Sequence, residues 1–217
     1  MVTGEERERL REAALGAGAC AAGFADPYRP PAVDRDYAAW IAAGNNATMR
    51  WLSEHQPLRA DPATVLPGVR TVISLAFPYL PAERRDPSLP YLPLYAYGRD
   101  YHKALRSLLR PFCSFIEGEY GVRTRVCVDS APVHERAFAL RAGIGRRGLN
   151  GCVITPRHGS FVFLAEVFTT LQVEPDDLSV GECLQCGRCV RACPAGALNG
   201  DGTMDAARCI NYLTIEH

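Results

Sequence analysis

Apolar residues recur along the chain with two different spacings, which predict a mixture of helices and strands. Spacings of three to four residues are typical of one helix face and predict helices at residues 5–17, 36–44, 47–55, 101–121 and 132–143. Alternating or continuous β-branched runs predict strands at residues 19–25, 69–79, 122–129, 152–156 and 160–170. The last two strands are expected to pair around a turn at residues 157–159. Helices and strands do not follow a strict β-α-β order, so we expect an α+β (mixed α/β) core with helices flanking a mixed sheet.

Proline and glycine mark several boundaries in this pattern. Pro111 is expected to kink the long helix at 101–121, and Pro132 is expected at the first position of the next helix. Residues 60–68 predict a short helix at most, and residues 81–93 predict a loop. The polar, acidic segment 173–182 resembles a linker. We therefore expect two domains, residues 1–175 and residues 176–217.

Composition limits the function classes. The 217 residues are 47% hydrophobic and 22% charged, which is globular and excludes a disordered chain. The formal net charge is zero, so no strong global field attracts nucleic acid, although a local basic patch is compatible with it. Lys103 is the only lysine among 24 basic residues. No apolar segment has the length of a signal core or a membrane span, which predicts a cytoplasmic protein without a membrane partner.

Nine cysteines in a reducing compartment do not predict a disulfide framework. Four of them lie in scattered apolar contexts and are expected to be buried thiols: Cys20, Cys113, Cys127 and Cys152. The other five lie in the last 35 residues of the chain. We therefore expect the chemistry of the cysteines to be concentrated there.

The segment ECLQCGRCVRACPAGAL has the spacing C-x2-C-x2-C-x3-C-P, formed by Cys183, Cys186, Cys189 and Cys193. This spacing is that of bacterial ferredoxin-type [4Fe–4S] clusters. Structural zinc sites usually have two C-x2-C pairs with a longer insert, so zinc is the weaker alternative. Cys209 follows sixteen residues later, as a further ligand or as a buried thiol.

The number of ligands leaves the cluster arrangement open. In the usual two-cluster arrangement, the fourth ligand of each cluster comes from the other motif. Only one full motif is present here. Either Cys193 or Cys209 completes one cluster locally, or a partner supplies ligands, or the chain is a piece of a longer protein.

Polar and aromatic residues gather in the stretch YAYGRDYHKALR, at a predicted helix start. The simplest interpretation is that Asp100 caps this helix. Asp100 and His102 also match the start of the cobalamin motif D-x-H-x-x-G, but Leu105 replaces its glycine. His102 is therefore not predicted to be a cobalt ligand.

Two further segments carry candidate chemistry. In VDSAPVHERA, Asp129 lies between a predicted strand and a predicted helix, where it could be a general acid, or where Asp129 or Ser130 could cap the helix. In AGIGRRGLNG, Arg146 and Arg147 lie in a glycine-rich connection that could hold a phosphate or could simply be solvated. The spacing leaves these alternatives open.

Taken together, these segments resemble the epoxyqueuosine reductase family. The resemblance extends over nearly the whole chain and is most specific in Y-x-x-GRDYHK-x-LR, VDSAP-x-x-ERA, GSF-x-FL-x-E and RCI-x-YLTIE. It implies a nitroreductase-like cobalamin-binding core followed by a ferredoxin-like segment. Family members continue past YLTIE with a second cysteine group and helical repeats, so this sequence resembles a truncated member.

The resemblance implies an activity and its cofactors. The family reduces epoxyqueuosine to queuosine in tRNA with cob(I)alamin, bound base-off and supplied with electrons by [4Fe–4S] clusters. Asp129 is the expected proton donor. The expected cobalamin contacts are Tyr97, Arg99, Asp100, Tyr101 and Ser130. The expected cluster ligands are Cys183, Cys186, Cys189, Cys193 and Cys209. The expected partners are tRNA carrying epoxyqueuosine and an electron donor such as a ferredoxin or flavodoxin, with the chain itself a monomer.

Two other functions remain as alternatives. The first is a corrinoid iron–sulfur reductase for another small substrate, which would share the chemistry but not bind tRNA. The second is a non-catalytic ferredoxin-like electron carrier or an inactive fragment, which would not bind cobalamin.

Overall fold

The computed structural model describes residues 2–28, 33–83, 86, 88, 92–176 and 181–216. Its helices are α1 (Gly4–Gly16), α2 (Val33–Ala42), α3 (Arg50–Glu54), α4 (Gln56–Ala60), α5 (Tyr101–Tyr120), α6 (Glu135–Arg141) and α7 (Arg188–Ala192). Its strands are β1 (Ala21–Ala25), β2 (Thr71–Pro78), β3 (Thr124–Cys127), β4 (Arg146–Arg147), β5 (Val153–Ile154) and β6 (Val162–Thr169). Short 3₁₀ turns span Pro62–Thr64, Leu94–Ala96 and Ala206–Arg208, and a π-helical turn spans Tyr212–Glu216.

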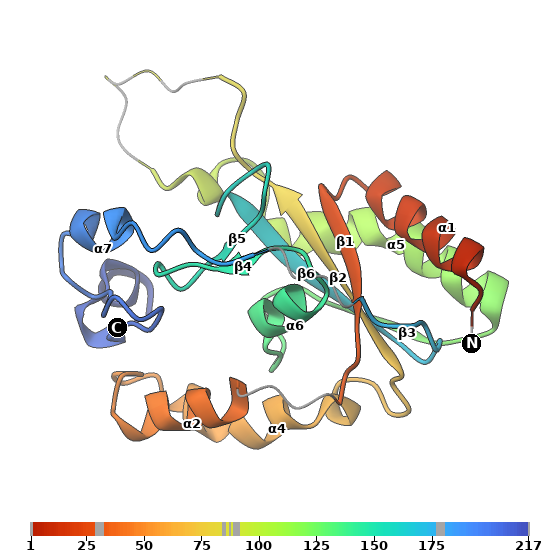
Figure 1. Cartoon of the computed structure of the whole chain (residues 1–217), viewed down its shortest axis with the longest axis horizontal. Coiled ribbons are helices and arrows are strands. Elements are labelled where there is room, and N and C mark those ends of the chain that lie inside the picture. Colours follow the sequence, from red (N-terminus) through yellow and green to blue (C-terminus); the bar gives the residue numbers. More distant parts are fainter. Residues whose placement is uncertain are drawn as a thin grey trace.

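The core is a four-stranded sheet in the order β1-β2-β6-β3, antiparallel at every pairing. Helices α1 and α5 cover one face and α6 covers the other (Figure 1). Seven consecutive residues of β2 are buried, because this central strand is covered on both faces. That is why its sequence is mostly apolar rather than alternating, with Thr71 and Ser74 as its two polar residues. The predicted α+β class is confirmed, with a sheet that is antiparallel rather than mixed.

The long amphipathic helix agrees closely with the sequence pattern. Helix α5 places Leu105, Leu109 and Ile116 in the core. The helix continues through Pro111 and ends at Tyr120, where Gly121 caps it in the left-handed conformation with a φ of 62°.

The predicted pairing of residues 152–156 with 160–170 is wrong, and an isolated bridge joins Thr155 to Gly159 in the predicted turn. Instead, β5 pairs with β4, and β6 pairs with β2 and β3. The glycine-rich segment makes this possible. A Cβ atom at Gly145 would lie 2.6 Å from the Ile154 carbonyl oxygen, and one at Gly148 would lie 2.7 Å from the Ile154 Cδ1 atom. Only glycines allow the two short strands to approach this closely.

Helix α6 begins at Glu135, so Pro132 lies before it rather than at its first position. Residues 128–134 form a loop closed by backbone hydrogen bonds from Ser130 to Val128 and from Val133 to Ala131. The N-cap is His134, which makes no side-chain capping bond. Neither Asp129 nor Ser130 therefore caps this helix.

A close approach between β1 and the end of α6 fixes the other side of that helix. A Cβ atom at Gly23 would lie 1.9 Å from the carbonyl oxygen of Ala142, so a larger residue would require a backbone shift.

The other helical predictions were nearly right. Predicted helix 36–44 corresponds to α2, helix 47–55 to α3, and segment 60–68 contains the short turn at Pro62–Thr64.

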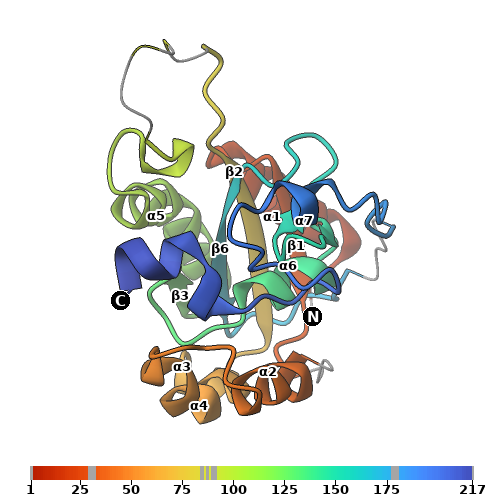
Figure 2. The same ribbon diagram turned by 90° about the vertical axis from the view of Figure 1, so that its left-hand side faces the viewer.

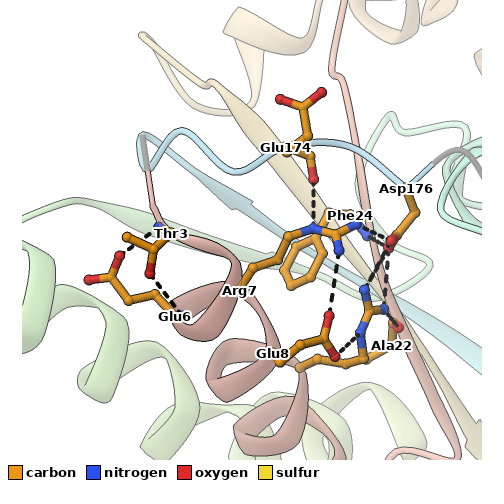
Figure 3. A network of polar contacts seen from close by, with 9 residues as sticks. Thr3, Glu6, Arg7, Glu8, Ala22, Phe24, Glu174 and Asp176 are labelled. Atoms are coloured by element: carbon orange, nitrogen blue, oxygen red, sulfur yellow. Dashed lines mark hydrogen bonds and ion pairs between the residues drawn. The ribbon is translucent and has the colours of Figure 1, made fainter.

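A buried carboxylate ties the first helix to the end of the core (Figure 3). The Asp176 side chain is only 3% exposed. It accepts hydrogen bonds from Arg7, from Arg11 Nη2 at 2.9 Å and from the backbone nitrogen of Phe24 at 2.8 Å. Part of the predicted linker, residues 177–180, lies outside the described residues, and the domain boundary near residue 175 stays a prediction.

The later part of the segment 181–216 lies beside helix α2 and the turn that follows it (Figure 2). Trp40 Nε1 donates to the Met204 carbonyl oxygen at 2.6 Å, and the Ala206 nitrogen donates to the Asn45 carbonyl oxygen at 2.9 Å. The hydroxyls of Thr48 and Tyr212 lie 2.6 Å apart. These bonds join the cysteine segment to the core.

The scattered cysteines differ in their exposure. Cys113 and Cys127 are buried as predicted, whereas Cys20 is partly exposed and Cys152 is exposed. Cys152 precedes the short strand β5 instead of lying in a longer buried strand. Within the described residues, no helix has the length and apolar character needed to cross a membrane.

Candidate active site

The start of α5 and the loop after β3 bring three predicted residues together. Tyr101 Oη donates a hydrogen bond to Asp129 Oδ2 at 2.8 Å, and His102 Nε2 lies 3.2 Å from the same oxygen. His102 Nδ1 lies 2.8 Å from Asp100 Oδ1, which also caps α5 by accepting from the His102 nitrogen. Two side chains of α5 therefore fix the Asp129 carboxyl group, which remains 62% exposed.

The remaining candidate cofactor contacts surround this group. Arg106 Nη2 donates to Ser130 Oγ at 2.6 Å, so Ser130 is oriented by α5. Tyr97 and Arg99 are exposed before α5, and within the described part of the chain neither hydrogen-bonds to Asp129. Lys103 is 86% exposed, with its Nζ 3.8 Å from Asp100 Oδ2.

A row of stacked rings lies next to Asp129. Tyr101 stacks on Phe163 with ring centroids 4.2 Å apart, His102 stacks on Tyr101 at 4.0 Å, and Tyr79 lies 4.6 Å from Phe163. Burial, together with the hydrogen bond to Asp129, raises the pKa of Tyr101 well above its usual range. Tyr101 therefore keeps its proton and remains a donor to Asp129 at neutral pH.

Two carboxyl groups lie behind the loop, Glu135, which is half-buried, and Glu166, which is fully buried. Glu135 Oε1 accepts a hydrogen bond from the backbone nitrogen of Asp129, and burial raises the pKa of Glu135 to about 7. Glu166, on β6, is fully buried and accepts from Ser74 Oγ at 3.2 Å. Burial, and then repulsion from Glu135, raises the pKa of Glu166 well above its usual range, so it is neutral. Its Oε2 atom has no hydrogen-bond partner within the described residues.

The sequence analysis missed a role for both glutamates. The one local signal was at Glu166, a charged residue inside the apolar run FVFLAEVF. A charged residue in a buried strand is rarely tolerated without a purpose.

The cysteine segment has the donor chemistry of an iron–sulfur site. Hydrogen bonds from the backbone of Gln185 and Leu149 lower the pKa of Cys183, and one from Ala197 lowers that of Cys193. A lowered pKa favours the thiolate, which is the ligand form. Over the described ranges, no three His, Cys, Asp or Glu side chains are arranged to hold one metal ion. The assignment of Cys183, Cys186, Cys189, Cys193 and Cys209 as ligands stays a prediction.

The fold and this cysteine run together define a class: an α+β core joined to an iron–sulfur segment. Residues 59–130 match the family model described as epoxyqueuosine reductase QueG, DUF1730, and residues 182–217 match the 4Fe-4S double cluster binding domain. The epoxyqueuosine reductase of Gloeobacter violaceus is 42% identical over 211 residues, covering 96% of this chain and 65% of that protein. The Vibrio cholerae enzyme is 39% identical, covering 82% of this chain and 50% of that protein.

Solved structures agree with these matches. An epoxyqueuosine reductase with an epoxyqueuosine-modified tRNA-Tyr stem loop matches with a TM-score of 0.83 and 29% identity, over 96% of this chain and 57% of that one. The Bacillus subtilis enzyme, solved with its catalytic aspartate loop swung out of the active site, gives 0.81 and 28% over the same shares. A catabolic reductive dehalogenase, at 16% identity and a TM-score of 0.51, shares the fold alone.

This chain belongs to the epoxyqueuosine reductase family over the part of the family that it spans. That part is about half to two thirds of the length of the two curated relatives. The expected family and the expected iron–sulfur segment at the end of the core are thereby confirmed.

Proposed function

We propose that this chain carries the catalytic core of an epoxyqueuosine reductase, which reduces epoxyqueuosine to queuosine in tRNA. The observation that carries the proposal is the convergence of Tyr101 and His102 on one oxygen of the exposed Asp129 carboxyl group. Such an arrangement fixes a proton donor toward the solvent-facing side of the site. The named relatives and the tRNA stem-loop complex support the substrate.

The reaction requires one proton donor at the departing oxygen. Two electrons and two protons enter, the two carbon–oxygen bonds of the epoxide break, a carbon–carbon double bond forms, and the oxygen leaves as water. Asp129 delivers a proton to that oxygen. Its position on a loop supports this role, because a Bacillus subtilis relative was solved with its catalytic aspartate loop in a different position.

The residues around Asp129 would hold the cofactor. The proposed cobalamin contacts are Tyr97, Arg99, Asp100, Tyr101 and Ser130. The stacked rings of Tyr101 and Phe163 offer a flat surface beside them. Cobalamin supplies a strongly nucleophilic low-valent cobalt when bound, and the iron–sulfur segment supplies its electrons. The protein contributes position and the proton.

The remaining partners follow from this function. A tRNA substrate places the protein in the cytoplasm. A low-potential one-electron protein such as a ferredoxin or flavodoxin would reduce the clusters, and the chain would act as a monomer.

The test uses the 217-residue chain reconstituted anaerobically with iron and sulfide. It is mixed with cobalamin and followed by EPR, then given an epoxyqueuosine-modified stem loop and followed by mass spectrometry for the loss of one oxygen atom. We expect a base-off cobalt signal and formation of queuosine. In Asp129→Asn, we expect the cobalt signal to remain and turnover to fall by about 10²- to 10⁴-fold.

The exposed variant Asp36→Asn is the matched control and should retain full turnover. Normal turnover in Asp129→Asn would remove Asp129 from the mechanism. A free-cobalamin signal in the parent chain would contradict the proposed cofactor site.

A further inference from the structure

The backbone at Asp129 adopts an uncommon conformation. Its φ is 56°, in the left-handed region that residues other than glycine rarely occupy. Asp is one of the few residue types that tolerate this region, but the conformation still requires support from its surroundings. The neighbouring residues must therefore hold this backbone in place.

Glu135 provides a direct contact to that backbone. Its Oε1 atom accepts a hydrogen bond from the Asp129 nitrogen. The Asp129 carboxyl group contacts different residues, Tyr101 and His102. The two ends of the residue are thus fixed separately, the main chain by Glu135 and the side chain by α5.

We propose, resting on the function proposed above, that Glu135 is a positioning residue. It holds the main chain of Asp129 in its left-handed conformation and thereby aims the carboxyl group of Asp129 into the site.

The surroundings of Glu135 suit this role. Arg59, on α4, donates from Nη1 to the carbonyl oxygen of Val133 at 2.8 Å, so a second residue fixes the same loop. A charged acceptor makes a stronger hydrogen bond to an N–H group than a neutral one does. The contact between Glu135 and Asp129 should therefore be strongest when Glu135 is ionised.

Charged and titratable groups face Glu135 from every element around it. They are Asp129 on the loop, Arg136 on α6, Arg59 on α4, Tyr101 on α5, Cys127 on β3 and Glu166 on β6. The two arginines favour the ionised form of Glu135, whereas burial and Asp129 oppose it. Because its pKa is raised, Glu166 is neutral at pH 7. The ionisation of Glu135 is therefore set by the two arginines, by Asp129 and by burial.

The test reads the Asp129 amide directly in the chain labelled with ¹⁵N-aspartate. In the parent chain, we expect its NMR shift to titrate with a midpoint near pH 7, as Glu135 ionises. In Glu135→Gln, the titration should vanish while the amide stays protected, because the Gln carbonyl oxygen also accepts. In Glu135→Ala, hydrogen exchange of this amide should accelerate by about ten- to a hundredfold, because a bond to a charged acceptor is lost.

Turnover gives a second, independent readout. Glu135→Ala should lower kcat by about a hundredfold, because the Asp129 carboxyl group is no longer held in its orientation. KM for the stem loop should change little, and Glu135→Gln should recover most of the rate. The exposed variant Glu12→Gln is the matched control and should match the parent chain.

Unchanged exchange of the Asp129 amide in Glu135→Ala would overturn the proposal. So would an equal loss of kcat in the Gln and Ala variants. The amide measurement needs neither cofactor nor substrate. If the parent chain shows no epoxide reduction but its Asp129 amide behaves as expected, the proposed function fails while the positioning role stands.

Discussion

The buried ion pairs of Asp176 with Arg7 and Arg11 of α1 should contribute strongly to the stability of the core. The perturbation is Asp176→Ala. The Asp176 side chain is 3% exposed, and its partners Arg7 and Arg11 are 23% and 19% exposed. Removal leaves two largely buried guanidinium groups and the buried nitrogen of Phe24 without this acceptor.

The magnitude follows from that geometry. Removing one partner of a buried ion pair costs about 3–5 kcal/mol. Because both arginines retain some contact with water, we expect the lower part of that range, about 3 kcal/mol. For a chain of this size, each kcal/mol lowers Tm by about 2–4 °C, so Tm should fall by about 6–12 °C.

The assay is urea and thermal unfolding at pH 7, followed by circular dichroism. The matched control is Asp36→Ala, which removes an exposed pair with Arg147 at 3.9 Å, whose side chains are 60% and 49% exposed. Exposed pairs contribute about 0–1 kcal/mol. The difference between the variants should persist at high salt, because buried pairs are screened little. Equal unfolding midpoints for the two variants would refute this reasoning.

Three further predictions concern other parts of the molecule. Gly23→Ala should destabilise the fold by about 1–3 kcal/mol, because its Cβ would collide with the Ala142 carbonyl oxygen; an unchanged urea midpoint would contradict this. Glu135 loses its proton near pH 4.5 in the unfolded state but near pH 7 in the folded state, because its pKa is raised from 4.5 to about 7 on folding. Stability should therefore fall by up to about 3 kcal/mol across that window as pH rises, and Glu135→Gln should flatten this slope in urea titrations at pH 5 and 8. Cys186→Ala should abolish the visible absorbance of the reconstituted cluster while leaving the far-UV circular dichroism unchanged, and an intact cluster spectrum would exclude Cys186 as a ligand.

The spacing of apolar residues was sufficient to predict the longer elements of the core. The mostly apolar run of β2 and the helical spacing of α5 are both determined by burial against neighbouring layers. The two-residue strands β4 and β5 are too short to show any periodicity. Their pairing depends on Gly145 and Gly148, which allow close contact. From the sequence alone, the segment that contains these glycines resembles a flexible connection.

The candidate site was likewise predicted only in part from the sequence. Sequence alone selected Asp100, Tyr101 and Asp129, and the structure brings these residues together. It gave His102 no role, because the cobalamin motif failed, yet His102 contacts Asp129. It missed Glu135, which lies at the first position of α6, three residues after the predicted start at Pro132, and which contacts Asp129.

The position of Lys103 has a practical consequence. It is the only lysine in the chain, it is 86% exposed, and it lies one turn before Arg106 at the start of α5. Thiol reagents would meet nine cysteines, five of which are predicted cluster ligands. An amine-reactive fluorophore instead has a single side-chain target, two residues from the tyrosine that contacts Asp129. The labelled protein, with no change to its sequence, could thus report the arrival of a ligand at this site by a change in emission.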